Sequence, residues 1–271
     1  MAEYYDLFWG YKITYPDFWI QQPAGDSVYF AARSECFDPL YEEPDAGFIA
    51  VKGEWNWAKK DIRPLWYENI GKTAGFLGAK DVGSAPWKMA GATGLEAEIV
   101  LPKKENRRLW TGILAYDFVV LHFMVSHPKI VRSYFEPLAT NLISSLTFTA
   151  TNVALDTSPE GIPVPPGYLS IDPKTIIEDI DDASKWRAYD GNASIGALQS
   201  FFVRTLPSNG WEILEYVPFT TLSDLGFARY KIKKGTYEVM LGIMPASVYD
   251  VESSQNRAKI VYKVNGYSAS Y

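Results

Sequence analysis

The chain has 271 residues, of which 47% are hydrophobic, 15% are aromatic and 21% are charged, and its formal net charge at pH 7 is −6. This length exceeds the roughly 100 to 200 residues of a typical single domain, so the sequence predicts two domains. The acidic balance argues against a nucleic-acid-binding protein, because binding to nucleic acid needs a basic face that neutralises phosphates.

Short strands are expected at the start of the first half. Residues 11–16 alternate between apolar and polar side chains, and residues 17–33 give two short strands that turn near Gly25. A loop with two prolines follows at residues 34–47, and the strand pattern resumes at residues 48–55. The pattern predicts an antiparallel sheet that opens with a hairpin.

A helix is predicted after this strand. Asp61 can cap its first turn, and Pro64 falls where a missing N–H costs nothing. Ile62, Trp66 and Ile70 recur at the spacing of one helical face. The periodicity therefore places the indole of Trp66 in the core.

Four consecutive strands are expected next, at residues 79–91, 92–102, 108–118 and 119–127. Sequential antiparallel pairing into a meander is their simplest arrangement. The basic cluster "KKENRR", residues 103–108, separates the second strand from the third. We interpret it as a solvated hairpin loop rather than an anion site.

The first half ends with a predicted helix and a final strand at residues 146–148. Pro137 falls within the helix and is expected to kink it or split it into two turns. The apolar stripe that predicts the helix comprises Ile130, Val131, Tyr134, Phe135, Leu138 and Leu142.

Residues 1–150 are assigned to a first domain, residues 151–167 to a proline-rich linker and residues 168–271 to a second domain. Asp172 resembles a helix cap, and the apolar residues after it suit either a short helix or a strand. A longer helix is predicted from Ser194, with strands at residues 211–217, 226–245 and 258–267. Each domain is thus expected to be α+β, an antiparallel β-sheet packed with one or two helices.

The first half resembles the PsbP-like fold, which is shared by the extrinsic photosystem II protein PsbP and a small Ran-binding nuclear import factor. The resemblance rests on "YKITYPDFWIQ" with "SVYFAA", on the helix near Trp66, on "WKMAGATGLEAEIVL" with its Gly-x-x-Gly turn, and on "YFEPLATNLISSLTF". It spans about Tyr11 to Phe148. Such domains commonly close with a helix that runs into a Ser-x-x-Phe strand, and Ser145 and Phe148 stand there.

The second half is similar to small domains of bacterial extracytoplasmic lipoproteins of unknown function, through "IPVPPGY", "ALQSFFVRTLPSNGW" and its three strands. Together the two resemblances imply a docking or assembly role, with no shared catalytic residues. They also favour a location outside the cytoplasm, although the chain shows no basic segment ahead of a long apolar stretch.

Reactive residues are few. His122 lies in an apolar strand and is expected to be a core or sheet-face histidine, while His127 precedes a proline and is expected in a turn or cap. The lone Cys36 excludes an intramolecular disulfide and a multi-cysteine zinc site. The acidic run at residues 178–182 lacks the glycine of a standard calcium loop. We therefore expect no catalytic residue, no metal site and no cofactor.

Aromatic and basic side chains cluster between the third strand and the first helix. Trp55 and Trp57 share one face of an extended segment by alternation, and Lys59, Lys60 and Tyr67 flank them. These five residues, called the aromatic patch below, either cover the core or form a docking surface with an apolar centre and a polar rim.

The favoured hypothesis is a two-domain, non-catalytic protein-binding or scaffolding protein without a membrane span, whose oligomeric state is left open. Two alternatives remain: a carbohydrate-active or other hydrolase that uses dispersed carboxylates, and a carrier of an apolar small molecule. A deep pocket in which two or more Asp or Glu side chains converge would count heavily against the favoured hypothesis.

Overall fold

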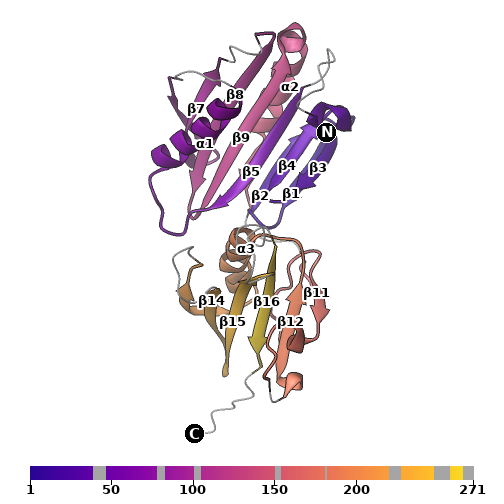
Figure 1. Cartoon of the computed structure of the whole chain (residues 1–271), viewed down its shortest axis with the longest axis vertical. Coiled ribbons are helices and arrows are strands. Elements are labelled where there is room, and N and C mark those ends of the chain that lie inside the picture. Colours follow the sequence, from indigo (N-terminus) through magenta and orange to yellow (C-terminus); the bar gives the residue numbers. More distant parts are fainter. Residues whose placement is uncertain are drawn as a thin grey trace. The chain divides into compact units, whose positions relative to one another are not determined.

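The computed structural model describes residues 1–38, 47–77, 83–100, 105–149, 154–180, 182–219, 227–246 and 257–264, and of residues 71–77 it describes the backbone (Figure 1). The chain divides into two compact units. The first unit comprises Met1–Asp6 and Tyr11–Phe148, and the second comprises Leu7–Gly10 and Thr149–Tyr271.

A seven-stranded antiparallel sheet forms the framework of the first unit. Its strands follow the order β3 (Ile20–Ala24), β4 (Ser27–Ala31), β5 (Phe48–Trp55), β9 (Val119–Pro128), β8 (Arg107–Tyr116), β7 (Ala92–Ile99) and β6 (Ala85–Met89). Strands β6, β7, β8 and β9 each pair with the next one along the chain, so the predicted meander is confirmed. The opening hairpin of β3 and β4 is confirmed as well.

A smaller sheet accompanies the large one. In it β2 (Tyr11–Tyr15) lies between β1 (Ala2–Asp6) and β10 (Thr147–Phe148), and both partners are antiparallel to it. The strand β10 corresponds to the expected final strand. The strand β1 was not expected, and in it intermediate and exposed side chains alternate.

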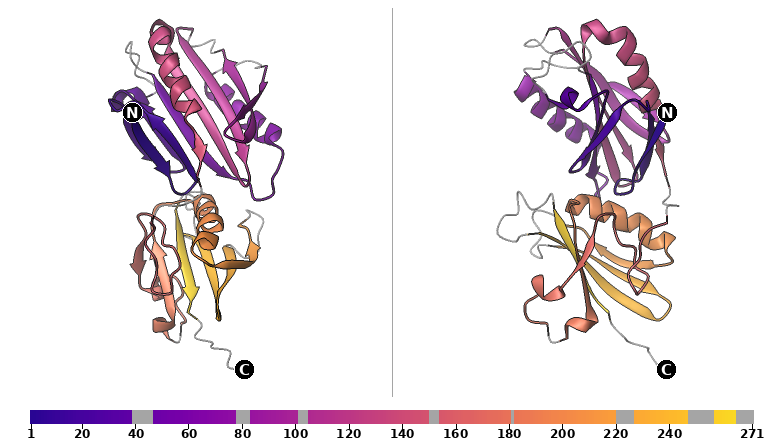
Figure 2. Two further views of the ribbon diagram at one scale, coloured as in Figure 1. Left: turned by 180° about the vertical axis from the view of Figure 1, so that it is seen from behind. Right: turned by 90° about the vertical axis from the view of Figure 1, so that its right-hand side faces the viewer.

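Two helices lie on opposite faces of the large sheet (Figure 2). Helix α1 (Ile62–Leu77) buries Trp66, which is 1% exposed, against Ile113 and Val120 of the sheet. Helix α2 (Arg132–Ser144) covers the other face, where Phe135 stacks on Trp19 at a centroid distance of 5.4 Å. The prediction that Trp66 is a core residue is confirmed.

Helix α2 differs from the prediction in two respects. It runs through Pro137 without a break, because this proline is exposed and removes only the hydrogen bond that the carbonyl of Ser133 in the first turn would accept. The buried stripe is also narrower than expected, since Ile130 is 80% and Tyr134 is 59% exposed. The helix begins only at Arg132, so Ile130 precedes it and is not part of its buried face.

The second unit is a six-stranded antiparallel sheet covered by helix α3 (Ile195–Ser208). The predicted cap is confirmed, because the Ser194 hydroxyl accepts a hydrogen bond from the amide of Ala197 at 3.0 Å. The helix buries Phe201 and Phe202, as expected. The strand order is β11 (Leu169–Ile171), β12 (Trp186–Asp190), β16 (Ala258–Lys263), β15 (Tyr237–Pro245), β14 (Ala228–Lys234) and β13 (Glu212–Val217).

A buried tyrosine joins helix α3 to this sheet. The hydroxyl of Tyr230 in β14 donates to the carbonyl oxygen of Gln199 in α3 at 2.9 Å. Burial raises the pKa of the Tyr230 hydroxyl well above its ordinary value, so this group stays a donor. Helix and sheet are thus connected by a polar contact inside an apolar core.

The segment expected to be a linker packs into the second unit over its described part, residues 154–167. Ile162 is buried, and the Trp211 indole donates to the carbonyl of Gly161 at 2.9 Å. The cap predicted at Asp172 is confirmed, and the region after it forms two 3-10 turns, Pro173–Thr175 and Ala183–Lys185, in place of the short α-helix or strand that was expected. Both turns are capped by aspartate side chains, which satisfies their first amides locally.

No helix in the described part of the chain combines the length and the apolar character that crossing a membrane would require.

Candidate functional site

A cavity of about 290 Å³ lies between helix α2 and strands β6 to β9 of the first unit. We call it the α2 cavity. Its apolar wall includes Trp87, Trp110 and Ile143, and its polar groups come from β7, β8, β9 and α2. Concave sites with an apolar lining and a few converging polar groups are the usual form of small-molecule binding sites.

The register of the sheet places these polar groups on one face. Glu98 pairs with Trp110 across β7 and β8, and Glu96 pairs with Gly112. Since side chains alternate along a strand, Glu96 and Glu98 point to the same side of β7, as do Arg108 and Trp110 on β8. Both sets line the cavity beneath α2.

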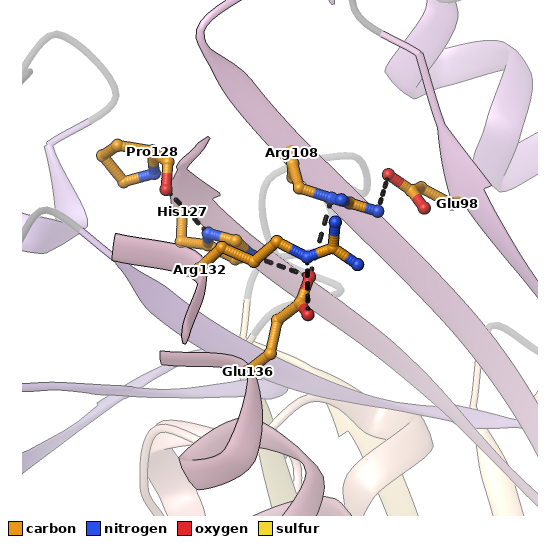
Figure 3. A network of polar contacts seen from close by, with 6 residues as sticks. All are labelled: Glu98, Arg108, His127, Pro128, Arg132 and Glu136. Carbon is orange, nitrogen blue, oxygen red and sulfur yellow. Dashed lines mark hydrogen bonds and ion pairs between the residues drawn. The ribbon is translucent and has the colours of Figure 1, made fainter. Parts of the chain in front are cut away.

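Glu136 of α2 stands at the centre of an ion-pair network (Figure 3). Its Oε2 lies 2.9 Å from Nε of Arg132, and its Oε1 lies 3.6 Å from Nε of Arg108. Arg108 also forms an ion pair with Glu98 of β7. Arg108 thus bridges two carboxylates. Its side chain is only 19% exposed, so these contacts are partly shielded from water.

His127 belongs to the same network, and the prediction that it lies in a turn or cap is wrong. It is a buried residue of β9, because the strand extends to Pro128. Its Nδ1 must donate to the carbonyl oxygen of Pro128, 2.9 Å away, since a carbonyl only accepts. Its Nε2 then faces Oε1 of Glu136 at 3.6 Å, a contact that becomes attractive when the ring is protonated.

Glu96 is the least compensated carboxylate of the cavity. It is half-buried, and its Oε2 accepts a hydrogen bond from the indole nitrogen of Trp110 at 3.1 Å. Among the described residues no cationic group contacts it.

The aromatic patch was the site expected from the sequence, and the structure brings part of it together. Trp55 is half-buried against Phe118, with ring centroids 5.5 Å apart. Nζ of Lys59 lies 4.3 Å from the centroid of the Phe118 ring and 2.7 Å from Oδ1 of Asp117. Trp55 and Lys59 therefore meet at the turn between β8 and β9.

Trp57, Lys60 and Tyr67 are exposed members of the patch. Trp57 is 41% exposed, and Tyr67 is 62% exposed on α1. The shared face of the two tryptophans stays a prediction, because β5 ends at Trp55 and the alternation of a strand does not extend to Trp57. The described contacts do not join Trp57 to Tyr67.

The remaining reactive residues of the first unit, His122 and Cys36, are buried outside the α2 cavity. His122 is buried on the sheet, as expected, and its Nε2 lies 2.8 Å from Oε2 of Glu54. Cys36 is buried in a 3-10 turn. No group of three or more residues able to hold a metal ion occurs within the described part of the chain.

The sequence interpretation missed the residues of the α2 cavity. Arg107 and Arg108 were placed in a solvated loop, but they begin strand β8, while Lys103 and Lys104 lie outside the described residues. Alternation in residues 92–99 could have shown that Glu96 and Glu98 share a face. Their meeting with α2 depends on the fold.

No family model and no curated protein matches the chain. Among solved structures, cyanobacterial PsbP from Synechocystis sp. PCC 6803 is similar at 15% identity and a TM-score of 0.42, covering 54% of this chain and 91% of its own. The Ran-binding protein Mog1p of Saccharomyces cerevisiae is similar at 9% identity and a TM-score of 0.37, covering 54% and 94%.

A protein of Bacteroides thetaiotaomicron is similar over more of the sequence, at 10% identity and a TM-score of 0.38, covering 89% of this chain and 85% of its own. PsbP and the Ran-binding protein belong to the group that the sequence of the first half was predicted to resemble. The predicted α+β class is confirmed by the antiparallel sheets and packed helices of the two units. These likenesses concern the fold.

Proposed function

We propose that this chain is a non-catalytic binding protein and that it contacts a partner protein through the aromatic patch. The observation that carries the proposal is the exposure of two large rings, Trp57 at 41% and Tyr67 at 62%. Tryptophan and tyrosine are enriched among the residues that dominate binding energy at protein interfaces.

The loop that carries Trp57 is held in place before any partner arrives. The side chain of Asn56 both accepts from the amide of Lys60 at 2.9 Å and donates to its carbonyl at 3.0 Å. Lys59 of the same loop forms an exposed ion pair with Asp117. A loop fixed in this way loses little conformational entropy on binding, which favours affinity.

The charged groups around the patch suit the rim of an interface. Lys60 is exposed at the end of the loop, and Lys59 lies against the Phe118 ring. Charges at a rim affect mainly the association rate and its dependence on salt. We expect the partner to present an apolar pocket for Trp57 with acidic residues nearby.

The α2 cavity gathers Glu96, Glu98 and Glu136, which is the kind of arrangement that would suit a hydrolase. Glycoside hydrolysis needs one carboxyl group that stays protonated to act as the acid. Glu98 and Glu136 are each paired with a guanidinium group, whereas Glu96 contacts no cation among the described residues. The convergence of three glutamates counts against the non-catalytic assignment, so the turnover test with Glu96→Gln described below is needed to decide between a hydrolase and a binding protein.

The resemblance of the second half to extracytoplasmic lipoproteins favours a place outside the cytoplasm of a bacterium for this binding. That location is part of the proposal.

A photo-crosslinking experiment tests the proposal. A benzophenone amino acid replaces Trp57 in one variant and Met240, an exposed residue of β15 in the second unit, in a control. We expect one protein to crosslink at Trp57 and not at Met240. With that protein purified, Trp57→Ala should weaken binding by roughly tenfold or more.

Equal crosslinking at both positions, or unchanged affinity of the Trp57→Ala variant, would exclude the aromatic patch as the docking surface. Turnover of a model glycoside that Glu96→Gln abolishes would refute the non-catalytic assignment.

A further inference from the structure

The described residues that line the α2 cavity carry an excess of negative charge. They include the three glutamates Glu96, Glu98 and Glu136 against one guanidinium, that of Arg108, and the ring of His127. Arg132 adds a second guanidinium from outside the cavity, where it contacts Glu136. Among the described residues, one of the three carboxylates has no cationic partner.

That carboxylate is Glu96. Arg108 is engaged by Glu98 and Glu136 at the α2 side of the cavity. Glu96 lies toward β6, where the described residues offer it the indole N–H of Trp110. A half-buried carboxylate with one neutral donor keeps unused acceptor positions, and a cation would fill them with strong hydrogen bonds.

The indole of Trp110, which donates to Glu96, contacts a second indole of the cavity wall, that of Trp87. The rings of Trp87 and Trp110 meet edge to face, with centroids 5.3 Å apart and an interplanar angle of 88°. They approach each other over Gly112, where a Cβ atom would lie 2.7 Å from Trp87 and 2.8 Å from Trp110. Tryptophan offers the most favourable ring face for a cation.

We propose that the α2 cavity binds a small organic cation. Its ammonium group is held by Glu96 and by the indoles of Trp87 and Trp110, and its apolar part contacts Met89 and Ile143. A purely apolar ligand is disfavoured because it would desolvate the charged wall without replacing the hydrogen bonds to water.

The size of the cavity limits the ligand. A volume of about 290 Å³ is at the lower end of the range for ligand sites, roughly 300 to 1,000 Å³. A free alkylamine and a single lysine side chain of a peptide both present an ammonium group on a short apolar stem. The cavity would recognise the same ammonium group in a free amine and in a peptide, and the experiment below distinguishes the two ligands.

Calorimetric titration of the full chain provides the test. The probes are n-butylammonium, tetramethylammonium and Nα-acetyl-lysine methylamide, with n-butanol and methyl β-glucoside as neutral controls. We expect at least one cation to bind about tenfold more tightly than n-butanol, because the butanol lacks the charge. Preference for the lysine derivative over n-butylammonium would indicate a peptide ligand.

Glu96→Gln is the decisive variant. The glutamine oxygen can still accept from the Trp110 indole, so the local structure is retained while the charge is removed. Cation binding should weaken by about tenfold, since the charge-assisted hydrogen bond is lost. Glu238→Gln makes the same change of charge on β15 in the second unit and should leave binding unchanged.

A second readout locates the ligand. Addition of the cation should shift the indole N–H resonances of Trp87 and Trp110 in the wild-type protein, and circular dichroism confirms that Glu96→Gln is folded. The inference is overturned if no cation binds, if Glu96→Gln binds as tightly as the wild type, or if either neutral control binds equally well.

Discussion

Gly112 in β8 provides a stringent test of the packing around the α2 cavity. Its backbone is outside the left-handed region, so alanine can adopt it without strain. The added Cβ atom would lie 2.7 Å from Cζ3 of Trp87 and 2.8 Å from Cη2 of Trp110, which is closer than such atoms approach in proteins. Gly112→Ala therefore forces the two indoles to move.

The size of the effect follows from two opposing contributions. Overpacking of a well-packed site costs about 1–3 kcal/mol. Replacing glycine by alanine at a compatible backbone position restricts the unfolded chain and returns about 0.4–1 kcal/mol. The free energy of unfolding of the first unit should therefore fall by about 1–2 kcal/mol. With a urea dependence of about 2 kcal/mol/M, the midpoint shifts down by roughly 0.5–1 M.

Urea unfolding followed through the fluorine signal of labelled Trp66 reports on the first unit, because this indole is buried in its core. Alanine substitutions at two further glycines serve as controls, one expected to be harmless and one expected to be more damaging than Gly112→Ala. At Gly242 of the second unit a Cβ atom meets its neighbours at 3.5 Å or more, and Gly242→Ala, followed through labelled Trp211, which is buried in that unit, should be neutral or slightly stabilising. At Gly94 it would lie 1.8 Å from the carbonyl oxygen of Ile113, which cannot move aside, so Gly94→Ala should be the most damaging.

The double variant Gly112→Ala with Trp87→Ala distinguishes crowding from other causes. If the indoles are responsible, removing Trp87 should recover part of the loss, as a positive coupling in a double-mutant cycle. A wild-type midpoint for Gly112→Ala, or strict additivity in the double variant, would refute the described packing.

Two further predictions concern the cores and a helix cap. Trp66→Ala should lower the free energy of unfolding by about 3–5 kcal/mol, because it empties a buried site, whereas Trp57→Ala should change it by about 0.5 kcal/mol or less. Urea titration measures both, and similar losses in the two variants would contradict the burial described. Ser194→Ala should cost the second unit about 1 kcal/mol and raise amide exchange in the first turn of α3, while Ser194→Asp should retain the cap. Unchanged exchange in Ser194→Ala would show that the cap is unimportant.

Sequence patterns correctly predicted the elements that are defined by residues close together in the chain, such as a helical face or a helix cap. The spacing of Ile62, Trp66 and Ile70 predicted the buried face of α1, and the Ser194 cap located the start of α3. Pro137 was overestimated as a helix breaker, because its effect depends on whether the affected carbonyl is exposed. The strand β1 lacks a strong apolar pattern and is defined by its pairing with β2, which no local signal reports.

The candidate sites were harder to predict from the sequence, because their residues are distant in the chain and come together only in the fold. Glu96 and Trp110 are 14 positions apart, and only the register of β7 and β8 joins them. Glu136 reaches the same cavity from α2. The exposure of Trp57 could not be settled by alternation, since the strand ends at Trp55 and the next residues follow a turn.

The two border strands of the large sheet, β3 and β6, each contain a proline, Pro23 and Pro86. Proline has no amide hydrogen to offer an incoming strand, and both strands are largely exposed. The sheet therefore resists growth by edge-to-edge addition of another copy. Association of copies through these two borders is therefore disfavoured even at the high concentrations that titration and spectroscopy demand.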